Sequence, residues 1–358
     1  MSDQDEARRA SVQASQIVGD LRADIVAGRL DAGQRIPTRI QIEERFQASP
    51  VTVQRALDTL TEEGFVVSRG RQGTFVTEMP PHRHRWALVF PLNPHVSGWN
   101  RYFAGLLRES QKVLLPNETL TPVYLVREHD GNQHYARDVA RLVADLMCGR
   151  LAGCIYTVPM FNKDKALPSS PRPSVTLCGA IDSVEPAVVI GGDWVELALS
   201  FLQTAGRRRL AYIGNVPTAR QLERRAELFA SHGMILHRHW SIGINPDTQA
   251  VPLARDIVRL LLDRPGAERP DGLMVGDDNL LEAALQGIKD VGLATPRDLT
   301  VIAHANHPEP VQPAMPCIRL GLDLRHMLRA ALELAMAVRD GGKPKPVVLQ
   351  PVTEPELR

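Results

Sequence analysis

The sequence predicts an α/β protein, in which a small helical domain with a β-hairpin precedes a larger domain built on doubly wound parallel sheets. Two observations carry this prediction. Residues 36–77 contain two short helical patterns, a tight turn and two β-branched runs around a glycine-rich loop. From residue 86 onward, short apolar runs alternate with longer segments of helical periodicity, which is typical of parallel sheets covered on both faces.

The small domain begins its motif with a helix expected to start at Thr38, whose hydroxyl can cap the free amides of the first turn. This helix is expected to end near Gln47. In the tight turn that follows, Ser49 is placed to cap a second helix, and Pro50 occupies the first helical position, where proline is best tolerated.

The second helix is expected to run from Pro50 to Gly64 and to bury one stripe of apolar residues at three- and four-residue spacing. Two β-branched and aromatic runs, 65–68 and 74–77, then flank a basic loop. Two helices, a tight turn and a basic hairpin make a winged helix-turn-helix. The predicted stripe consists of Val53, Ala56, Leu57 and Leu60.

This order of motifs resembles the GntR-type winged helix domain over residues 15–77. The resemblance depends on five short matches, which are Ile36-Pro37, Thr52-Val53, Ala56-Leu57, Glu63-Gly64 and Gly73-Thr74-Phe75-Val76. Three positions depart from the family pattern, because Ile40, Pro50 and Gln54 stand where arginine is common. The resemblance implies that the domain binds DNA.

Total charge does not predict nucleic-acid binding, because residues 1–78 hold ten Arg and no Lys against twelve Asp and Glu. The distribution of charge does predict nucleic-acid binding. Asp58, Glu62 and Glu63 fall at the far end of the second helix, away from the arginines near its start and on the hairpin. The alternative is an ordinary solvated charged face. The residues expected at DNA are Thr38, Arg39, Ser49, Thr52, Gln54, Arg55, Arg69, Gly70, Arg71, Gln72 and Gly73.

Domain boundaries follow from composition. Residues 1–13 are polar and are expected to form a disordered tail. A helix from Ala14 should pack under the second helix of the motif, so that the winged helix domain covers 14–78. Residues 79–85 contain two prolines and no apolar periodicity, which predicts a linker before a sensor domain at 86–358.

The chain has 358 residues, 44% of them hydrophobic, and a net charge of +1, which is ordinary globular composition. It lacks a run of about 18 apolar residues, and its charged start lacks the apolar core of a signal peptide, so we expect a cytoplasmic protein with no membrane partner.

Cysteines and histidines do not predict a metal site. The cysteines, Cys148, Cys154, Cys178 and Cys317, lie far apart without a CxxC pair, which favours reduced buried thiols. Alternate histidines such as His82 and His84 lack the third and fourth ligands that a metal requires. We therefore expect neither a metal nor a cofactor.

The alternating part predicts strands at 86–90, 121–126, 153–158, 174–178, 188–191, 209–214, 235–240, 272–275, 299–304, 317–320 and 346–349. The expected helices are 99–115, 134–148, 194–205, 219–231, 250–262, 279–291 and 324–339. Roughly 270 such residues exceed one Rossmann core, so two similar lobes are expected.

Three runs in this part, 205–214, 270–278 and 296–302, resemble the effector domain of LacI-type regulators, which is itself similar to periplasmic sugar-binding proteins. The likeness extends from about Arg85 to the end of the chain. It implies two lobes joined by three crossovers, with a ligand in the cleft between them. It also implies that Arg225 and Asp278 match the arginine and aspartate with which the family binds its ligand.

Physical reasoning also predicts a ligand at the carboxyl ends of the strands, where loops of a doubly wound sheet converge. Carboxylates, amides, an arginine and indole rings suit a polyhydroxylated ligand. Two alternatives remain: Asp278 caps the helix expected at Asn279, or Arg225 forms a surface ion pair. The expected ligand-binding residues are Asn93, Trp99, Asn100, Tyr156, Asp193, Arg225, Asp278 and Asn306.

An enzyme is not expected, because the chain has no GxSxG, Walker loop, HExxH or GxGxxG motif. A secreted carrier is disfavoured by the winged helix. The sequence thus predicts a homodimeric transcriptional repressor that binds operator DNA and releases it when a sugar binds. The alternative is a regulator that responds to a nucleoside or other small metabolite and tightens on DNA.

Overall fold

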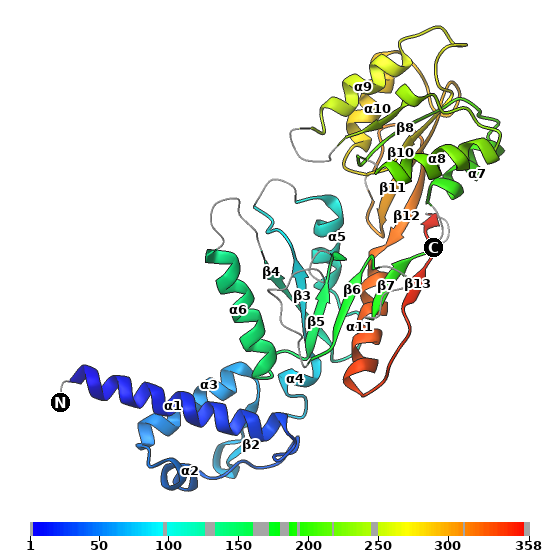
Figure 1. Ribbon diagram of the computed structural model, residues 1–358. Helices are drawn as coiled ribbons and strands as arrows, with labels where there is room; N and C mark the ends of the chain where they lie inside the picture. Colours follow the sequence, from blue (N-terminus) through cyan, green and yellow to red (C-terminus); the bar gives the residue numbers. More distant parts are fainter. Residues whose placement is uncertain are drawn as a thin grey trace. The chain divides into compact units, whose positions relative to one another are not determined.

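The computed structural model describes residues 3–95, 99–125, 133–159, 172–179, 186–191, 194–216, 218–244, 250–310 and 312–353 (Figure 1). The chain divides into two compact units. The first comprises Met1–Pro91, Val113–Thr176 and Leu332–Lys345, and the second comprises Leu92–Lys112, Leu177–Ala331 and Pro346–Arg358. Within the described ranges, no helix has both the length and the apolar character of a membrane span.

The N-terminal domain is the predicted winged helix. Thr38 caps the second helix through a capping box with Gln41, and Ser49 caps the third, which begins at Pro50. Gly64 ends that helix in the left-handed region at φ 88°, where glycine is favoured. The elements are α1 (Asp3–Val26), α2 (Arg39–Phe46), α3 (Pro50–Glu63), β1 (Val66–Ser68), the short 3₁₀ helix η1 (Gly70–Gln72) and β2 (Thr74–Val76).

Near the N-terminal domain, the structure differs from the expected domain boundaries in two places. Helix α1 starts at Asp3 rather than Ala14, since no glycine or proline interrupts the chain before Gly19. The side-chain amide of Gln13 ties α1 to the end of α2 by donating to the carbonyls of Phe46 and Gln47. In the expected linker, residues 81–84 form a short helix, α4 (Pro81–His84), which proline at the first position favours.

The first large sheet has six strands in the order β13-β7-β6-β5-β3-β4, as predicted for a parallel fold. Every strand pair whose register is defined in this sheet is parallel. Its strands are β3 (Arg85–Phe90), β4 (Thr119–Tyr124), β5 (Gly153–Tyr156), β6 (Ser174–Leu177), β7 (Ala187–Ile190) and β13 (Val347–Leu349), and the helices of this part are α5 (Arg101–Ser110), α6 (Gln133–Met147) and α11 (Leu324–Arg339).

The second large sheet has the order β14-β12-β11-β10-β8-β9 and is parallel except for the β12–β14 pair. Its strands are β8 (Leu210–Gly214), β9 (Ser241–Gly243), β10 (Gly272–Val275), β11 (Thr300–His307), β12 (Ile318–Asp323) and β14 (Val352–Thr353), and its helices are α7 (Trp194–Thr204), α8 (Ala219–Ser231), α9 (Leu253–Leu262) and α10 (Leu281–Asp290).

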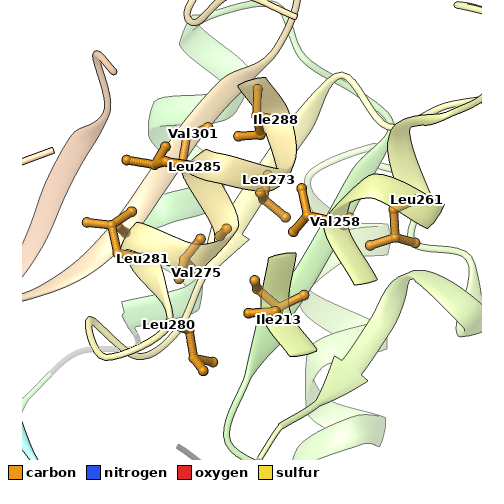
Figure 2. Packing of buried hydrophobic residues seen from close by; sticks show 14 of the residues in the cluster. Ile213, Val258, Leu261, Leu273, Val275, Leu280, Leu281, Leu285, Ile288 and Val301 are labelled. Carbon is orange, nitrogen blue, oxygen red and sulfur yellow. The ribbon is translucent and has the colours of Figure 1, made fainter. Parts of the chain in front are cut away.

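Helices cover both faces of this second sheet, because successive strand residues point to opposite sides. On one face, Leu273 and Val275 of β10 pack with Val258 of α9 and Leu285 of α10 (Figure 2). On the other, Met274 packs with residues of α7 and α8. This packing fixes the strand ends that carry the polar residues described below.

One expected strand is wrong. Residues 235–240 do not form it; Arg238–Trp240 instead make a 3₁₀ helix, and β9 follows at Ser241. Trp240 is buried at 2% exposure, whereas the three residues before it are exposed, so the alternation that a strand requires is absent. The two-residue strand β14 was too short for a sequence pattern to reveal.

Candidate functional sites

The outward face of α3 lines a groove of about 660 Å³ with the start of α2. Arg39 and Arg55 lie toward its beginning, where the amino end of α3 adds the positive end of the helix dipole. Asp58 and Glu62 line its far end. The charge gradient means that a polyanion is attracted to the first turns of α3 and repelled from its last.

The groove brings together three of the predicted DNA residues, Arg39, Gln54 and Arg55. It does not include Thr52, which is only 5% exposed. The hydroxyl of Thr52 lies 2.9 Å from the Ser49 hydroxyl, and its backbone N–H donates to the same oxygen. The expectation that the Thr52 side chain lies at DNA is therefore wrong, because this side chain is used inside the domain to hold the start of α3.

The wing is the hairpin formed by β1, η1 and β2. It carries the predicted arginines and packs on one supporting residue that sequence reasoning missed. Arg71 is exposed on η1, and the Arg69 guanidinium lies 4.7 Å from the centre of the Phe75 ring. A Cβ atom at Gly73, which has a left-handed φ of 110°, would lie 2.7 Å from Nε of Arg35. The Arg35 side chain thus lies against the wing at Gly73. Sequence reasoning did not identify this supporting role, because Arg35 precedes the first helix of the motif and is far from the hairpin in sequence.

In the second unit, Asp278 and Asn306 form a buried pair at the carboxyl ends of β10 and β11. The two residues are 3% and 5% exposed, and Nδ2 of Asn306 donates to Oδ2 of Asp278 at 2.8 Å. Burial raises the pKa of the Asp278 carboxyl from 3.8 to about 6, against the opposing effect of the Asn306 hydrogen bond. Oδ1 of Asn306 is buried with no hydrogen-bond partner among the residues described.

Asp278 does not cap the following helix, which was the alternative reading of this residue. The turn is closed by its neighbour Asp277, whose Oδ1 accepts from the backbone N–H and the side-chain Nδ2 of Asn279 at 2.9 and 2.7 Å. Helix α10 itself begins only at Leu281, without a side-chain cap. Asp278 is thus left to pair with Asn306.

Arg225 of α8 is also buried, at 8% exposure, so it is not the surface residue of the alternative reading. Its guanidinium carbon lies 3.6 Å from the centre of the Tyr212 ring, and Nη1 donates to the Ser241 hydroxyl at 3.1 Å. Burial raises the pKa of the Tyr212 hydroxyl. The arrangement holds a flat cation on an aromatic face at the end of β8.

The start of α5 lies against the turn before α10. The backbone N–H of Arg101 donates to Oδ1 of Asn279 at 3.1 Å, and its guanidinium pairs with Glu282. Sequence reasoning missed this contact, because 178 residues separate Arg101 from Asn279. Of the two expected residues beside it, Asn100 caps α5 by accepting from the Phe103 N–H at 3.0 Å, and Trp99 is half-buried.

Two of the other expected ligand residues make contacts of their own. Tyr156 is 8% exposed and packs in the apolar core of the first unit with Leu125 and Tyr135. The side chain of Asn93 accepts from the His95 N–H in its own loop. Asp193 lies outside the described residues.

Comparisons with known proteins match two separate parts of the chain. Residues 13–76 match the gntR family of bacterial regulatory proteins, and residues 199–358 match the periplasmic binding protein-like domain. The arabinose metabolism transcriptional repressor of Geobacillus stearothermophilus is 20% identical over 308 residues, which cover 80% of each chain.

Solved structures show the same fold. A regulatory protein of the LacI family from Chloroflexus aggregans is 18% identical at a TM-score of 0.57, over 75% of this chain and 96% of that one. A complex of the transcriptional regulator CelR with cellobiose is 21% identical at a TM-score of 0.55, over 86% and 91%. The chain is therefore a transcriptional regulator that joins a DNA-binding domain of the gntR family to a periplasmic binding protein-like domain with the fold of LacI-type regulators.

Proposed function

We propose that the protein is a cytoplasmic, homodimeric repressor that leaves its operator when a sugar binds beside Asp278, Asn306 and Arg225. The observation that carries the proposal is the buried pair Asp278–Asn306, in which Oδ1 of Asn306 has no donor among the described residues. A buried acceptor without a partner costs free energy, about 1 to 3 kcal/mol, that a ligand hydroxyl would recover.

The surroundings of the pair suit hydroxyl groups on a small ring. Carboxylate and amide oxygens accept from hydroxyls, and Arg225 donates to them while its stacking on Tyr212 keeps its plane fixed. The similarity to an arabinose repressor and to a regulator solved with cellobiose supports a sugar as the effector.

Operator control would follow from a difference in ligand affinity between two states of the dimer. A two-fold dimer places its two DNA-binding domains in successive major grooves about 34 Å apart, and a ligand that favours another geometry weakens the complex. Coupling of this kind is typically about 1 to 3 kcal/mol, so we expect operator affinity to fall roughly 5- to 150-fold.

The test begins with the full-length protein in a thermal-shift screen against L-arabinose, D-ribose, cellobiose and a set of nucleosides. A ligand that binds only the folded state must raise the melting temperature. Asp278→Asn and Arg225→Met should abolish the shift, whereas Asp298→Asn, at an exposed turn of the same unit, should keep it. A sugar that shifts all four proteins equally would show that it binds elsewhere.

The second step measures operator affinity with and without the active sugar, on duplexes that the protein selects from a random library. Loss of affinity on adding sugar supports the repressor, and a gain of affinity would reverse the sign of the proposal. Sedimentation of the full chain at micromolar concentration tests the dimer. A nucleoside hit in place of a sugar would establish the alternative effector.

A further inference from the structure

One residue of the groove on α3 is apolar and conspicuously exposed. Val51 is 74% exposed, although the apolar residues on the opposite face of α3 are buried in the domain core. Single exposed apolar side chains are common and need no explanation by themselves. The exposure of Val51 does have an explanation in its position. Val51 lies in the first turn of α3 and lines the groove with Arg39 and Arg55.

The charges along α3 decide which part of the helix can approach DNA. Val51, Arg55, Asp58 and Glu62 recur at helical spacing and line the same groove. Asp58 and Glu62 would face phosphates with like charge if the helix lay flat along the major groove. The helix must therefore enter by its first turns, which places Val51 at the front of the reading surface.

Gln54, the polar residue of the groove that follows Val51 on α3, already makes a hydrogen bond within the protein. Nε2 of Gln54 donates to Oδ1 of Asp58 at 2.6 Å. A glutamine needs both its amide nitrogen and its oxygen to pair with the edge of an adenine. The bond uses one of the two N–H groups of Gln54 and holds its amide toward the acidic end of α3, so the apolar side chain of Val51 remains as the reading element at the first turn.

Thymine is the base that matches an exposed valine. Its C5 methyl group is the apolar feature of the major groove, and no other unmodified base carries one. Val51 is also β-branched and stiff in a helix, so its two methyl groups are held in place before DNA arrives. Pro50 fixes the backbone just before it.

We propose that Val51 is a specificity-determining residue that reads a thymine in each half-site, by packing its side chain on the C5 methyl group of that base. The inference rests on the proposed binding of operator DNA and adds the chemistry of one base contact to it. Removing one methyl group from the contact should cost about 4-fold in affinity, the equivalent of one buried methylene-sized group.

The experiment removes apolar groups from each side of the contact in turn. Duplexes are first selected from a random library by the full-length protein, and each thymine of the selected site is then replaced by deoxyuridine, which lacks only that methyl. We expect one thymine per half-site at which this change weakens binding about 4-fold. Val51→Ala should weaken binding to the thymine duplex and remove the difference between thymine and uracil at that position.

Two further variants keep the outcome clear. Val12→Ala makes the same change at a valine that is 64% exposed on α1 and outside the groove, and it should keep both the affinity and the thymine preference. Val51→Thr keeps the shape of the side chain but replaces a methyl group by a hydroxyl, and it should reduce the thymine preference.

The failures can be told apart. If no sequence is enriched, the proposed operator binding fails, and this inference fails with it. If a site is enriched but no thymine responds to uracil, or if Val51→Ala keeps the response, operator binding stands and the role of Val51 is overturned.

Discussion

The side-chain amide of Asn306 donates a 2.8 Å hydrogen bond to the carboxylate of Asp278, and water reaches almost none of either side chain. Asn306 lies in β11, and Asp278 lies in the turn that follows the adjacent parallel strand β10. Burial holds the pKa of Asp278 at about 6, well above its ordinary 3.8. A carboxylate in this state destabilises the folded protein at neutral pH, a cost often found at binding sites.

The pH dependence of stability should report this cost. Because the folded protein binds the Asp278 proton more tightly than the unfolded chain does, its contribution to stability falls as the pH rises from about 4 to about 6 and stays low above that. Asp278→Asn removes the effect and should stabilise the protein by about 2 to 3 kcal/mol at pH 7. Urea unfolding at pH 4 and pH 7 measures it, since the gain should vanish at pH 4.

Asp298 is the control with the opposite sign. Arg297 and the backbone N–H of Ala294 lower the pKa of Asp298 to about 2, so its stabilising effect is present above pH 3.8 and lost as the pH falls toward 2. Asp298→Asn should therefore reduce stability at pH 7. Equal behaviour of the two variants would argue against the assigned environment of Asp278.

Arg225 should be intolerant of lysine. Lysine keeps the charge but loses the flat stack on Tyr212 and the fixed bond to Ser241. We expect Arg225→Lys to weaken the response to the active sugar at least about tenfold, while operator binding without sugar is unchanged. Arg224→Lys, on the exposed side of the same helix, should respond like the parent. Titration of sugar against the operator complex distinguishes them.

Glu63 at the end of α3 should stabilise the first unit. Its two carboxylate oxygens pair with Arg22 of α1 at 2.6 Å and with Arg150, which follows α6, at 3.1 Å. Glu63→Gln should cost about 1 to 3 kcal/mol, because a partly buried charged hydrogen-bond pair is lost. Chemical unfolding of the full chain measures the loss. Glu62→Gln, at the exposed neighbour, should be close to neutral, and a similar loss there would point to a general effect of charge.

Arg71 on the wing should contribute to DNA affinity without regard to sequence. Replacing it by alanine should weaken binding to selected and unselected duplexes alike and reduce the salt slope by roughly 0.9 for one lost phosphate contact. Affinities at four salt concentrations check this. Arg264→Ala, an exposed arginine of the second unit, provides the comparison, and an unchanged slope in Arg71→Ala would remove the wing arginine from the interface.

Local chemistry let the sequence determine most elements. Thr38 and Ser49 cap the helices they were expected to cap, and α8, β10 and α11 begin and end at the predicted residues. Capping, proline at a first helical turn and apolar periodicity act over a few residues, so they can be read without the fold. The two-part architecture followed from the same signals.

Only the tertiary structure decided which side chains share an environment. Arg101 meets Asn279 across 178 positions, and Asn306 meets Asp278 because β10 and β11 are neighbours in the sheet. The same folding buries Thr52 and Tyr156, which residue type alone had placed at the surface of a site. Strand order and loss of water are properties of the packed molecule, and they set hydrogen-bond partners and the pKa of Asp278, so no short stretch of sequence contains them.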